Sequence, residues 1–315
     1  ELVIILFLSF FALFITKFLI EDKNKALLSK ALSEYVSADV AREILTSSWK
    51  INLNWENKRI TMFFSDIAGF TTISEKMSPE ELVSFLKIYL WEMSNIILDK
   101  RWFINKYEWD AIMALWWVFG HAERYWVLDA CESCLLQQKT LKALNEKWIA
   151  EWQHTLSVRM WIHTWPAIIW NIWATWRKME FTALGDNVNL ASRLEWVNKY
   201  YKTNICASED IYNDAKDLYT FRYLDEIKVK WKDNAIKIYE LISRIWEESD
   251  FQKDIISKFE QAISLYQEQN FTQALEIFKQ LELLWDAPSW VYLERCEKFM
   301  HSNDGFNWIT TMEEK

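Results

Sequence analysis

Strand-like and helix-like runs alternate across residues 60–242, and this alternation restricts the chain to folds that pack helices against a sheet. The apolar run RITMFFSDI, residues 59–67, predicts a buried strand. Residues 78–100 then space their apolar side chains as an amphipathic helix does. Ser78 suits the N-cap of that helix, and Pro79 suits its first position.

Two further strands are predicted after this helix. FINKY at residues 103–107 and DAIMALW at residues 110–116 indicate a hairpin that turns around Glu108 and Trp109. A second helix and the strand LSVRMWIHT come after the hairpin. The order of these elements predicts an α+β or α/β sandwich.

The composition is that of a globular protein, with 51% hydrophobic and 26% charged residues. A net charge of -9 and a pI near 5.2 argue against binding to nucleic acid. Cys131 and Cys134 form a C-x-x-C pattern inside a predicted helix. A redox or zinc site is one interpretation, but two small buried residues in a reducing compartment is the favoured one.

Residues 2–16, LVIILFLSFFALFIT, are almost wholly apolar, and the run is cut by the start of the chain. A signal-peptide core is the alternative, but the following TKFLIEDKNK lacks a small-residue cleavage site. We therefore expect residues 1–20 to be the truncated end of a transmembrane helix. Residues 21–55 would form a helical connector, which is either a spacer or a transmitter of signals.

Residues 250–315 are predicted to form a helical tail. FEQAISLYQEQNFTQALEIFKQL, residues 259–281, has two helical halves that meet at Gln269 and Asn270. Its small and aromatic positions are similar to those of one tetratricopeptide unit: Ala262, Tyr266, Ala274 and Phe278. Because one such unit cannot bury its own apolar face, the tail is expected to dock on another surface.

Two stretches carry candidate metal-binding and phosphate-binding residues. In FFSDIAGFTTISEKMSPEEL, Asp66 ends a strand and Gly69 follows in a turn, whose backbone N–H groups can bind phosphate. Asp110 opens a strand that could pair with the strand of Asp66, and two neighbouring carboxylates favour divalent cations between them. Lys106 suits a buried strand only if it has a partner. A capped turn without ligands is the alternative.

A third stretch, MEFTALGDNVNLASRLE, covers residues 179–195. Asn189 and Arg193 are four residues apart, so they project from one helix face. Arg193 could neutralise a transferring phosphate while Asn189 donates a hydrogen bond beside it. A surface ion pair and a helix cap are the alternatives.

Taken together, the three stretches resemble the catalytic domain of class III adenylate and guanylate cyclases, over roughly residues 56–243. The connector is similar to the AFSRYVSPEVVEELL-type entry of bacterial membrane cyclases. The tail is similar to those of cyclases with extracytoplasmic CHASE2 sensors. The resemblance implies an α+β, ferredoxin-like domain that converts ATP to cyclic AMP and pyrophosphate in signal transduction, at the inner membrane with the catalytic domain in the cytoplasm.

The same resemblance assigns roles to single residues. Asp66 and Asp110, with the carbonyl of Ile67, match the ligands of two Mg²⁺ or Mn²⁺ ions. Lys106 and Thr182 match the pair that reads the purine, and Gly69, Phe70 and Thr71 match the phosphate-binding turn. Asn189 and Arg193 match the transition-state pair. Lys230 or, as second choice, Lys232 matches the lysine that meets the terminal phosphates. One metal would activate the ribose 3′-hydroxyl, and a homodimer would complete each site from both subunits.

The departures from the family pattern share one form. The chain has 21 Trp and 4 Gly, whereas about 7% Gly, or roughly 22 residues, is usual. The family motifs read GFIDKYIGDAIMAFWG, RIGIHTGPVVVGNIG, GRKMEYTALGD, SRLEGLNK and VKGK. Ten glycine positions of these motifs are tryptophan in this chain: Trp102, Trp109, Trp117, Trp161, Trp165, Trp170, Trp173, Trp176, Trp196 and Trp231. Trp116 matches a true family tryptophan. The hypothesis is that UGA codons for glycine were translated as tryptophan, and that the literal chain misfolds.

Three alternatives to an adenylate cyclase stay open. A guanylate cyclase is disfavoured by Lys106, because that family generally has Glu at this position. A catalytically inactive cyclase-like module for nucleotide binding or dimerisation is disfavoured by the competent residue types at the motif positions. A purely structural membrane protein would not need paired aspartates.

Overall fold

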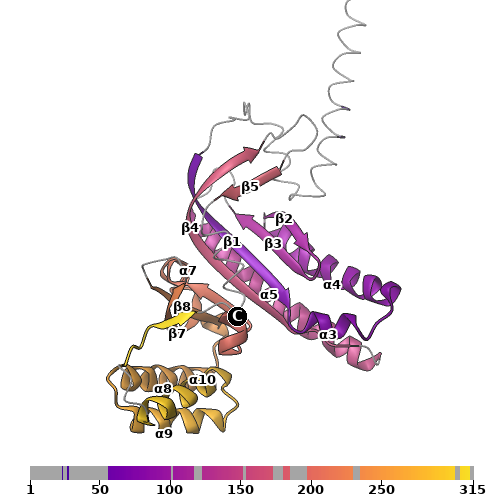
Figure 1. The fold of residues 1–315 in the computed structure, drawn as a ribbon. Helices are drawn as coiled ribbons and strands as arrows, with labels where there is room; N and C mark the ends of the chain where they lie inside the picture. Colours follow the sequence, from indigo (N-terminus) through magenta and orange to yellow (C-terminus); the bar gives the residue numbers. More distant parts are fainter. Residues whose placement is uncertain are drawn as a thin grey trace, which may run out of the picture.

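The computed structural model describes residues 56–100, 102–116, 123–151, 154–172, 180–184, 197–229, 235–301 and 306–312, together with Lys23 and Leu27. Within this part of the chain, nine strands form one sheet in the order β2-β3-β1-β4-β6-β8-β7-β9, and β5 pairs with β4 outside that path. Most neighbouring strands are antiparallel. The α+β class is therefore confirmed, with helices packed against the sheet (Figure 1).

The first half of the fold surrounds two long central strands. Its elements are β1 (Glu56–Ile67), α3 (Phe70–Ser74), α4 (Pro79–Asp99), β2 (Phe103–Glu108), β3 (Ala111–Trp116), α5 (Glu123–Ala150), β4 (Val158–Ile172) and β5 (Glu180–Leu184). β1 pairs along its whole length with β4, from Glu56 opposite Ile169 to Ile67 opposite Val158.

The second half adds shorter strands and the helical tail. Its elements are β6 (Ile205–Ser208), α7 (Glu209–Ala215), β7 (Tyr219–Val229), β8 (Ile236–Arg244), a 3₁₀ turn (Ile245–Glu247), α8 (Asp250–Gln267), α9 (Phe271–Glu282), α10 (Ala287–His301) and β9 (Thr310–Met312). β9 returns to the sheet and pairs in parallel with the end of β7.

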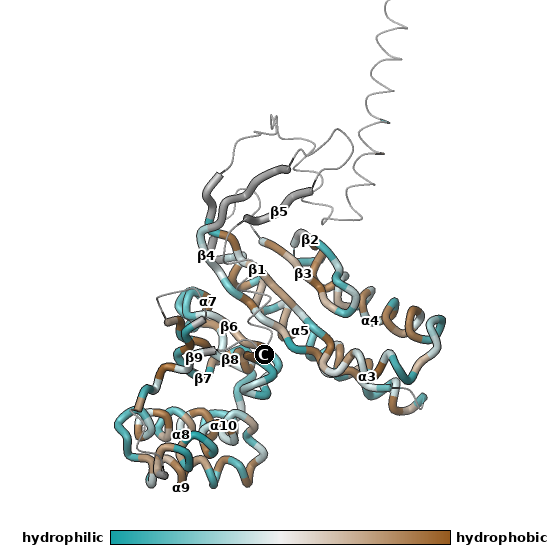
Figure 2. The backbone as a smooth tube through the Cα atoms, viewed as in Figure 1, coloured by the Kyte–Doolittle hydropathy of each residue, from teal (hydrophilic) through white to brown (hydrophobic). Residues whose placement is uncertain are grey.

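One hydrophobic core lies between α4, α5 and the β1–β3 side of the sheet. Figure 2 shows hydrophobic residues along β1 and β3, whereas α4 alternates between hydrophobic and polar residues as its amphipathic sequence predicts. Cys131 and Cys134 are fully buried in this core as free thiols. Burial raises the pKa of both thiols, so their interpretation as small core residues is confirmed.

Helix α4 begins where the sequence predicts. Ser78 accepts a hydrogen bond from the backbone N–H of Glu81, and the Glu81 carboxylate accepts one from the backbone N–H of Ser78. This reciprocal capping box satisfies two otherwise unpaired donors, and Pro79 occupies the first helical position.

The turn of the β2–β3 hairpin lies one residue further along the chain than the sequence suggested. Glu108 pairs with Ala111, so the turn consists of Trp109 and Asp110, and Asp110 precedes β3 instead of opening it. Trp109 has a φ of 56° and is 88% exposed. Two-residue hairpins need positive φ at the first turn position because of the strand twist, and glycine is the residue that supplies it without strain.

Two tryptophans at the other end of this hairpin compete for one space. Trp102 and Trp116 are both buried, and their rings lie closer together than two packed aromatic side chains can. Aromatic pairs normally keep their ring centres about 4.5–7 Å apart. The indole N–H of Trp116 donates to the carbonyl of Lys100, whereas the buried N–H of Trp102 has no acceptor among the described residues. The space therefore suits one indole, that of Trp116.

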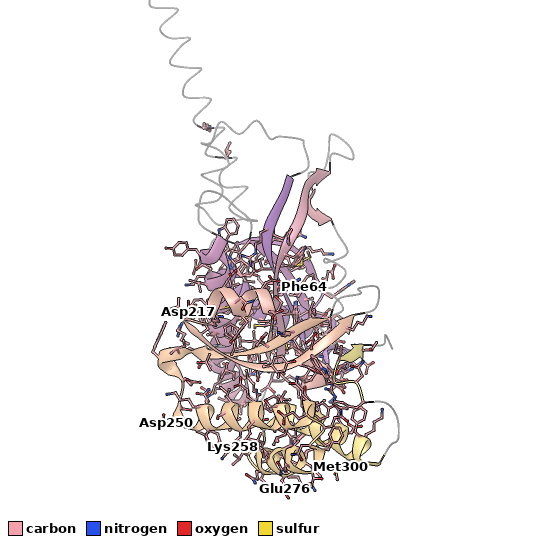
Figure 3. The ribbon with its side chains drawn as sticks, turned by 90° about the vertical axis from the view of Figure 1, so that its left-hand side faces the viewer. Phe64, Asp217, Asp250, Lys258, Glu276 and Met300 are labelled. Atoms are coloured by element: carbon pink, nitrogen blue, oxygen red, sulfur yellow. The ribbon has the colours of Figure 1, made fainter. Side chains whose placement is uncertain are left out.

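A second hydrophobic core joins the sheet to the helical tail. Strands β7 and β8 contribute Leu224, Ile227 and Ile238, and the tail contributes its predicted apolar face, Ala262, Tyr266, Ala274 and Phe278. In Figure 3, Asp250, Lys258, Glu276 and Met300 mark the tail, which lies against the β7–β8 part of the sheet. The tail thus buries its apolar face on the same sheet that carries the motifs.

Helix α9 ends in a geometry that the sequence analysis did not anticipate. Trp285 has a φ of 62° and donates its backbone N–H to the carbonyl of Glu282, while the N–H of Asp286 reaches the carbonyl of Leu281. These two bonds form a Schellman motif with Trp285 at the left-handed position, where glycine is the usual residue. Pro288 shortly afterwards is the accompanying signal for a helix end.

The membrane expectations concern residues outside those described. No helix in the described part of the chain is both long and apolar enough to cross a membrane. The predicted membrane segment at 1–20 and the connector at 21–55 fall outside it, apart from two helical residues, Lys23 and Leu27.

Candidate functional site

Asp66 lies near the end of β1, one residue before the buried Ile67. The register places it directly opposite Arg159 of β4, and the Arg159 Nη2 lies 3.3 Å from the Asp66 Oδ2. The Asp66 side chain is 17% exposed, so it is neither sealed in the core nor fully solvated. A partly exposed carboxylate at a strand end can accept a ligand without a large structural change.

Asp110 lies beside Asp66 because β1 and β3 are neighbours. Ser65 pairs with Ile112, and continuing this register sets Asp66 opposite Ala111, next to the turn residue Asp110. The predicted pairing of these two strands is thus confirmed, with Asp110 in the turn. Asp66 and Asp110 therefore occupy neighbouring positions at the ends of adjoining strands.

The two aspartates both act electrostatically on the buried phenol of Tyr89. Tyr89 belongs to α4 and is fully buried beneath β1 and β3. Burial raises the pKa of this phenol, and the negative charges of Asp66 and Asp110 raise it further. The phenol of Tyr89 therefore lies within the electrostatic field of both carboxylates, and it stays uncharged at physiological pH.

Lys106 differs from the expectation for a buried strand position. It lies in β2 opposite Met113 of β3, its side chain is 51% exposed, and it forms an ion pair with Glu108. Because β2 is the edge strand of the sheet, this side chain reaches solvent instead of the core. The predicted need for a partner is met on the same strand.

The turn after Asp66 has the predicted form. Gly69 has φ 70° and ψ 25°, and its carbonyl accepts hydrogen bonds from the backbone N–H groups of Thr72 and Ile73 at 3.0 and 3.2 Å. Phe70 and Thr71 begin the short helix α3, immediately after this turn. A left-handed residue is needed here, which glycine provides.

Thr182 is not brought to the aspartates within one chain. It lies in β5, opposite Trp170 of β4, whereas Asp66 is opposite Arg159 of the same strand. From Arg159 to Trp170 is eleven residues, or roughly 36 Å along the strand. Within one chain, Asp66 and Asp110 therefore lie at the ends of adjoining strands, whereas Thr182 lies at the other end of β4.

The remaining predicted site residues lie outside the described part of the chain: Asn189, Arg193, Lys230 and Lys232. Sequence reasoning missed Arg159 and Tyr89. The signal for Arg159 was a single charge inside the otherwise apolar strand VRMWIHT. Tyr89 carried no signal beyond its place on the apolar stripe of α4.

The aspartate pair fits a hard divalent cation. Its donors are carboxylate oxygens on adjoining strand ends, which Mg²⁺ and Mn²⁺ prefer, and the carbonyl of Ile67 lies next in the chain. Among the described residues, no group of three or more His, Cys, Asp or Glu side chains could hold a metal ion. A cation at Asp66 and Asp110 would thus leave coordination positions for a ligand.

The comparisons with known proteins agree with this geometry. Residues 54–243 match the family described as "Adenylate and Guanylate cyclase catalytic domain". Adenylate cyclase 1 of Rhizobium meliloti is 35% identical over 189 residues, which cover 59% of this chain and 28% of that protein. The adenylate cyclase of Anabaena cylindrica is 36% identical over 191 residues, which cover 58% of this chain and 37% of that protein. The chain therefore spans about a third of the length of these relatives.

Solved structures show the same fold. The adenylyl cyclase CyaB of P. aeruginosa is 31% identical, with a TM-score of 0.55 over 61% of this chain and 97% of that one. The guanylyl cyclase Cya2, at 24% identity and a TM-score of 0.53, supports the fold alone. The family match covers more than half of the chain, and the chain belongs to the adenylate and guanylate cyclase catalytic domain family.

Proposed function

We propose that this protein is an adenylate cyclase that converts ATP to 3′,5′-cyclic AMP and pyrophosphate in signal transduction. The pairing of Asp66 and Asp110 at adjoining strand ends carries the proposal, because it supplies the carboxylates that nucleotide cyclisation requires. The adenylate cyclases of R. meliloti and A. cylindrica, at 35% and 36% identity, favour ATP as the substrate. Lys106 supports the same choice through the family pattern.

Class III cyclases use divalent metal ions, and we propose two Mg²⁺ or Mn²⁺ ions at each site. Asp66 and Asp110 would hold them, with the Ile67 carbonyl assisting. When bound, such ions lower the pKa of the ribose 3′-hydroxyl and neutralise charge on the phosphates. Arg159 faces Asp66 from β4 and reduces the repulsion between the two carboxylates before a cation binds.

The other proposed roles follow the family motifs. Lys106 and Thr182 would read the adenine, and the turn at Gly69, Phe70 and Thr71 would bind phosphate oxygens. Asn189 and Arg193 would stabilise charge on the α-phosphate while the 3′-hydroxyl attacks it, and Lys230 would meet the departing pyrophosphate.

We propose that the active form is a homodimer with two equivalent sites. The separation of roughly 36 Å along β4 between the levels of Asp66 and Thr182 supports a site shared between two chains. The aspartates of one subunit would then meet the base-reading and transition-state residues of the other. A closed two-fold arrangement is the usual way to complete such sites in pairs.

We further propose an inner-membrane location with the catalytic domain in the cytoplasm. The apolar run at residues 2–16 supports this location, as does the four-cysteine chain, whose described thiols are all free and buried. The similarity of the tail to those of CHASE2-type cyclases supports a sensor on the other side of the membrane.

Several tryptophans of this sequence are proposed to be glycines encoded by UGA. The left-handed φ of Trp109 and the crowding of Trp102 against Trp116 support this for two motif positions. The Schellman position of Trp285 supports it for a residue outside the motifs. UGG codons at Trp109, Trp161 and Trp165 would contradict the proposal.

The substrate is tested by a competition assay with the chain of residues 1–315 carrying glycine at the motif positions. Equal ATP and GTP are supplied with Mg²⁺ or Mn²⁺, and cyclic AMP and cyclic GMP are separated by chromatography. We expect cyclic AMP to dominate, and Lys106→Glu to shift the ratio toward cyclic GMP. Dominant cyclic GMP would favour a guanylate cyclase, and no cyclic product would favour an inactive nucleotide-binding module.

A further inference from the structure

Asp225 of β7 is a buried meeting point between the sheet and the C-terminal segment. Its Oδ2 accepts hydrogen bonds from the hydroxyl of Tyr201 at 2.5 Å, from Nη1 of Arg295 at 2.7 Å and from the hydroxyl of Thr310 at 2.6 Å. Its Oδ1 accepts the backbone N–H of Glu226 at 2.7 Å. The carboxylate is 3% exposed, so these donors replace its hydration.

Arg295 of α10 occupies a pocket made by aromatic rings. Its guanidinium lies 4.8 Å from the ring centre of Tyr292 and 5.4 Å from that of Tyr200. Its Nη2 also donates to the hydroxyl of Tyr201 at 3.0 Å. A planar guanidinium held by rings and by a carboxylate has one orientation, so Arg295 fixes both Asp225 and Tyr201.

A second buried network joins the same two parts of the molecule. Arg222 of β7 pairs with Glu240 of β8 and with Asp286, which precedes α10. Ser289 of α10 donates to the Asp286 Oδ2 at 2.5 Å. This network resembles the first in burial and charge, but Glu240, Asp286 and Ser289 all belong to the sheet and the tail.

The two networks differ in what else they touch. Tyr201 ends the helical residues 197–201, which begin four positions after Arg193 in the sequence. Asn198 of the same helix donates to the carbonyl of Met160 at 2.7 Å, so these residues are fixed to β4 on one side and to Asp225 on the other. The Asp225 network therefore reaches the chain next to a transition-state motif.

The same carboxylate lies close to the start of a second motif. Thr310 begins β9, which pairs with β7 at Ile227, Lys228 and Val229. Lys230, the proposed phosphate-binding lysine, is the next residue along the chain. The last described residues of the protein thus hold β7 up to the residue before that lysine.

Resting on the proposed cyclase activity, we propose that α8–α10 and β9 form a positioning element of the catalytic unit. It acts through Asp225, with Tyr201, Arg295 and Thr310 as positioning residues for the segments that carry Arg193 and Lys230. None of these residues touches substrate in this proposal. Their effect is on turnover, because small displacements of charge-stabilising groups reduce a rate by up to about 10²-fold.

Two matched variants, each of which lacks one hydroxyl group, test the proposal in the glycine-restored chain of residues 1–315. Thr310→Val removes one hydrogen bond from the tail to Asp225, and Ser289→Ala removes one from the tail to Asp286. Tyr201→Phe removes the hydroxyl that links the helix to Asp225, and Arg295→Lys is the conservative variant for the tail. The readouts are kcat and KM for ATP, the thermal midpoint, and amide hydrogen exchange of residues 197–201 without nucleotide.

We expect Thr310→Val and Tyr201→Phe to lower kcat about tenfold with an unchanged KM for ATP, and to speed exchange in residues 197–201. Arg295→Lys should retain part of the rate, since it keeps a donor to Asp225. Ser289→Ala should lower the thermal midpoint while kcat and exchange at residues 197–201 stay unchanged. Equal losses of kcat in Ser289→Ala and Thr310→Val, or no loss in either, would overturn the positioning role. An unsubstituted chain that makes no cyclic nucleotide would instead contradict the proposed function.

Discussion

At one end of the sheet Asp66 is partly exposed, faces Arg159 and shares its surroundings with the carboxylate of Asp110. In β7, Asp225 is buried and accepts hydrogen bonds from three side chains that come from different parts of the sequence. Both residues are aspartates of one sheet, but their surroundings differ. Those of Asp66 suit the binding of a ligand, whereas those of Asp225 suit a contact that holds elements together.

The difference lies in which side chains are available to satisfy each charge. Around Asp225 the chain supplies its own donors, so the carboxylate holds elements together and has no remaining capacity for a ligand. Around Asp66 a second negative charge is placed nearby, which raises the energy of the site until a cation binds. A pair of carboxylates at a partly exposed strand end thus indicates a ligand-binding site. A buried carboxylate whose hydrogen bonds are all made within the chain indicates a structural contact.

Asp110→Ala should have the largest effect on catalysis. We expect the rate of cyclic AMP formation to fall roughly 10³-fold, because the charge that holds the cations is lost. Thermal unfolding of the variant is measured beside the rate, so that a loss of folding is distinguished from a loss of the metal site. A variant that retains most of the rate would contradict the role of this site.

Asp225→Asn should have the largest effect on stability. Arg295 would be left buried without its counter-charge, and we expect the free energy of unfolding to fall by about 3–5 kcal/mol, measured by urea denaturation. Asp66→Asn is the matched comparison on the same sheet, with a smaller expected loss, because the ion pair of Asp66 with Arg159 is more exposed than that of Asp225 with Arg295. Comparable stabilities for the two variants would contradict the distinction between the aspartates.

Trp109 offers a test of the hairpin that carries Asp110. In a glycine-restored chain that keeps the indole only at Trp109, we expect a loss of roughly 1–2 kcal/mol in the free energy of unfolding, because a side chain disfavours positive φ. The chain with glycine at all ten motif positions, including position 109, is the control. Equal stability of the two chains would argue against a glycine at the turn.

The smallest expected effect concerns Glu132 of α5, which accepts hydrogen bonds from the guanidinium of Arg244. These bonds lower the pKa of the Glu132 carboxyl below its usual 4.5. A lowered folded-state pKa means that the pair stabilises the fold above the unfolded pKa, and that this contribution is lost as pH falls through the folded pKa.

Glu132→Gln should therefore lower stability by about 1 kcal/mol at pH 7, and the difference from the parent chain should shrink below about pH 4. Denaturant titrations at both pH values measure it. A difference that persists unchanged at low pH would show that the ion pair does not contribute.

The features that the sequence predicted are those with local causes. Ser78, Pro79 and Glu81 start α4 through bonds between residues three apart, and Gly69 marks a turn that requires positive φ. The hairpin was predicted, but its turn lies one residue further along, because the register of the strand pairing determines where the turn falls. The causes of such features lie within a few residues, so the sequence alone indicates them.

The features that could not be predicted depend on distant residues. Asp225 meets Thr310 across 85 positions of sequence and Arg295 across 70, and no periodicity announces such contacts. The partnership of Arg159 with Asp66 likewise follows from the register of β1 and β4. The role of Trp285 became visible only through its φ and its two backbone hydrogen bonds.

The most direct measurement is the yield of cyclic AMP from ATP. The glycine-restored chain of residues 1–315 and its Asp110→Ala variant are assayed side by side with saturating Mn²⁺. We expect a clear product from the first chain and about 10³-fold less from the second, with both equally folded by circular dichroism. Equal product from the two chains, or none from either folded chain, would contradict the assignment of Asp66 and Asp110 as the catalytic metal site.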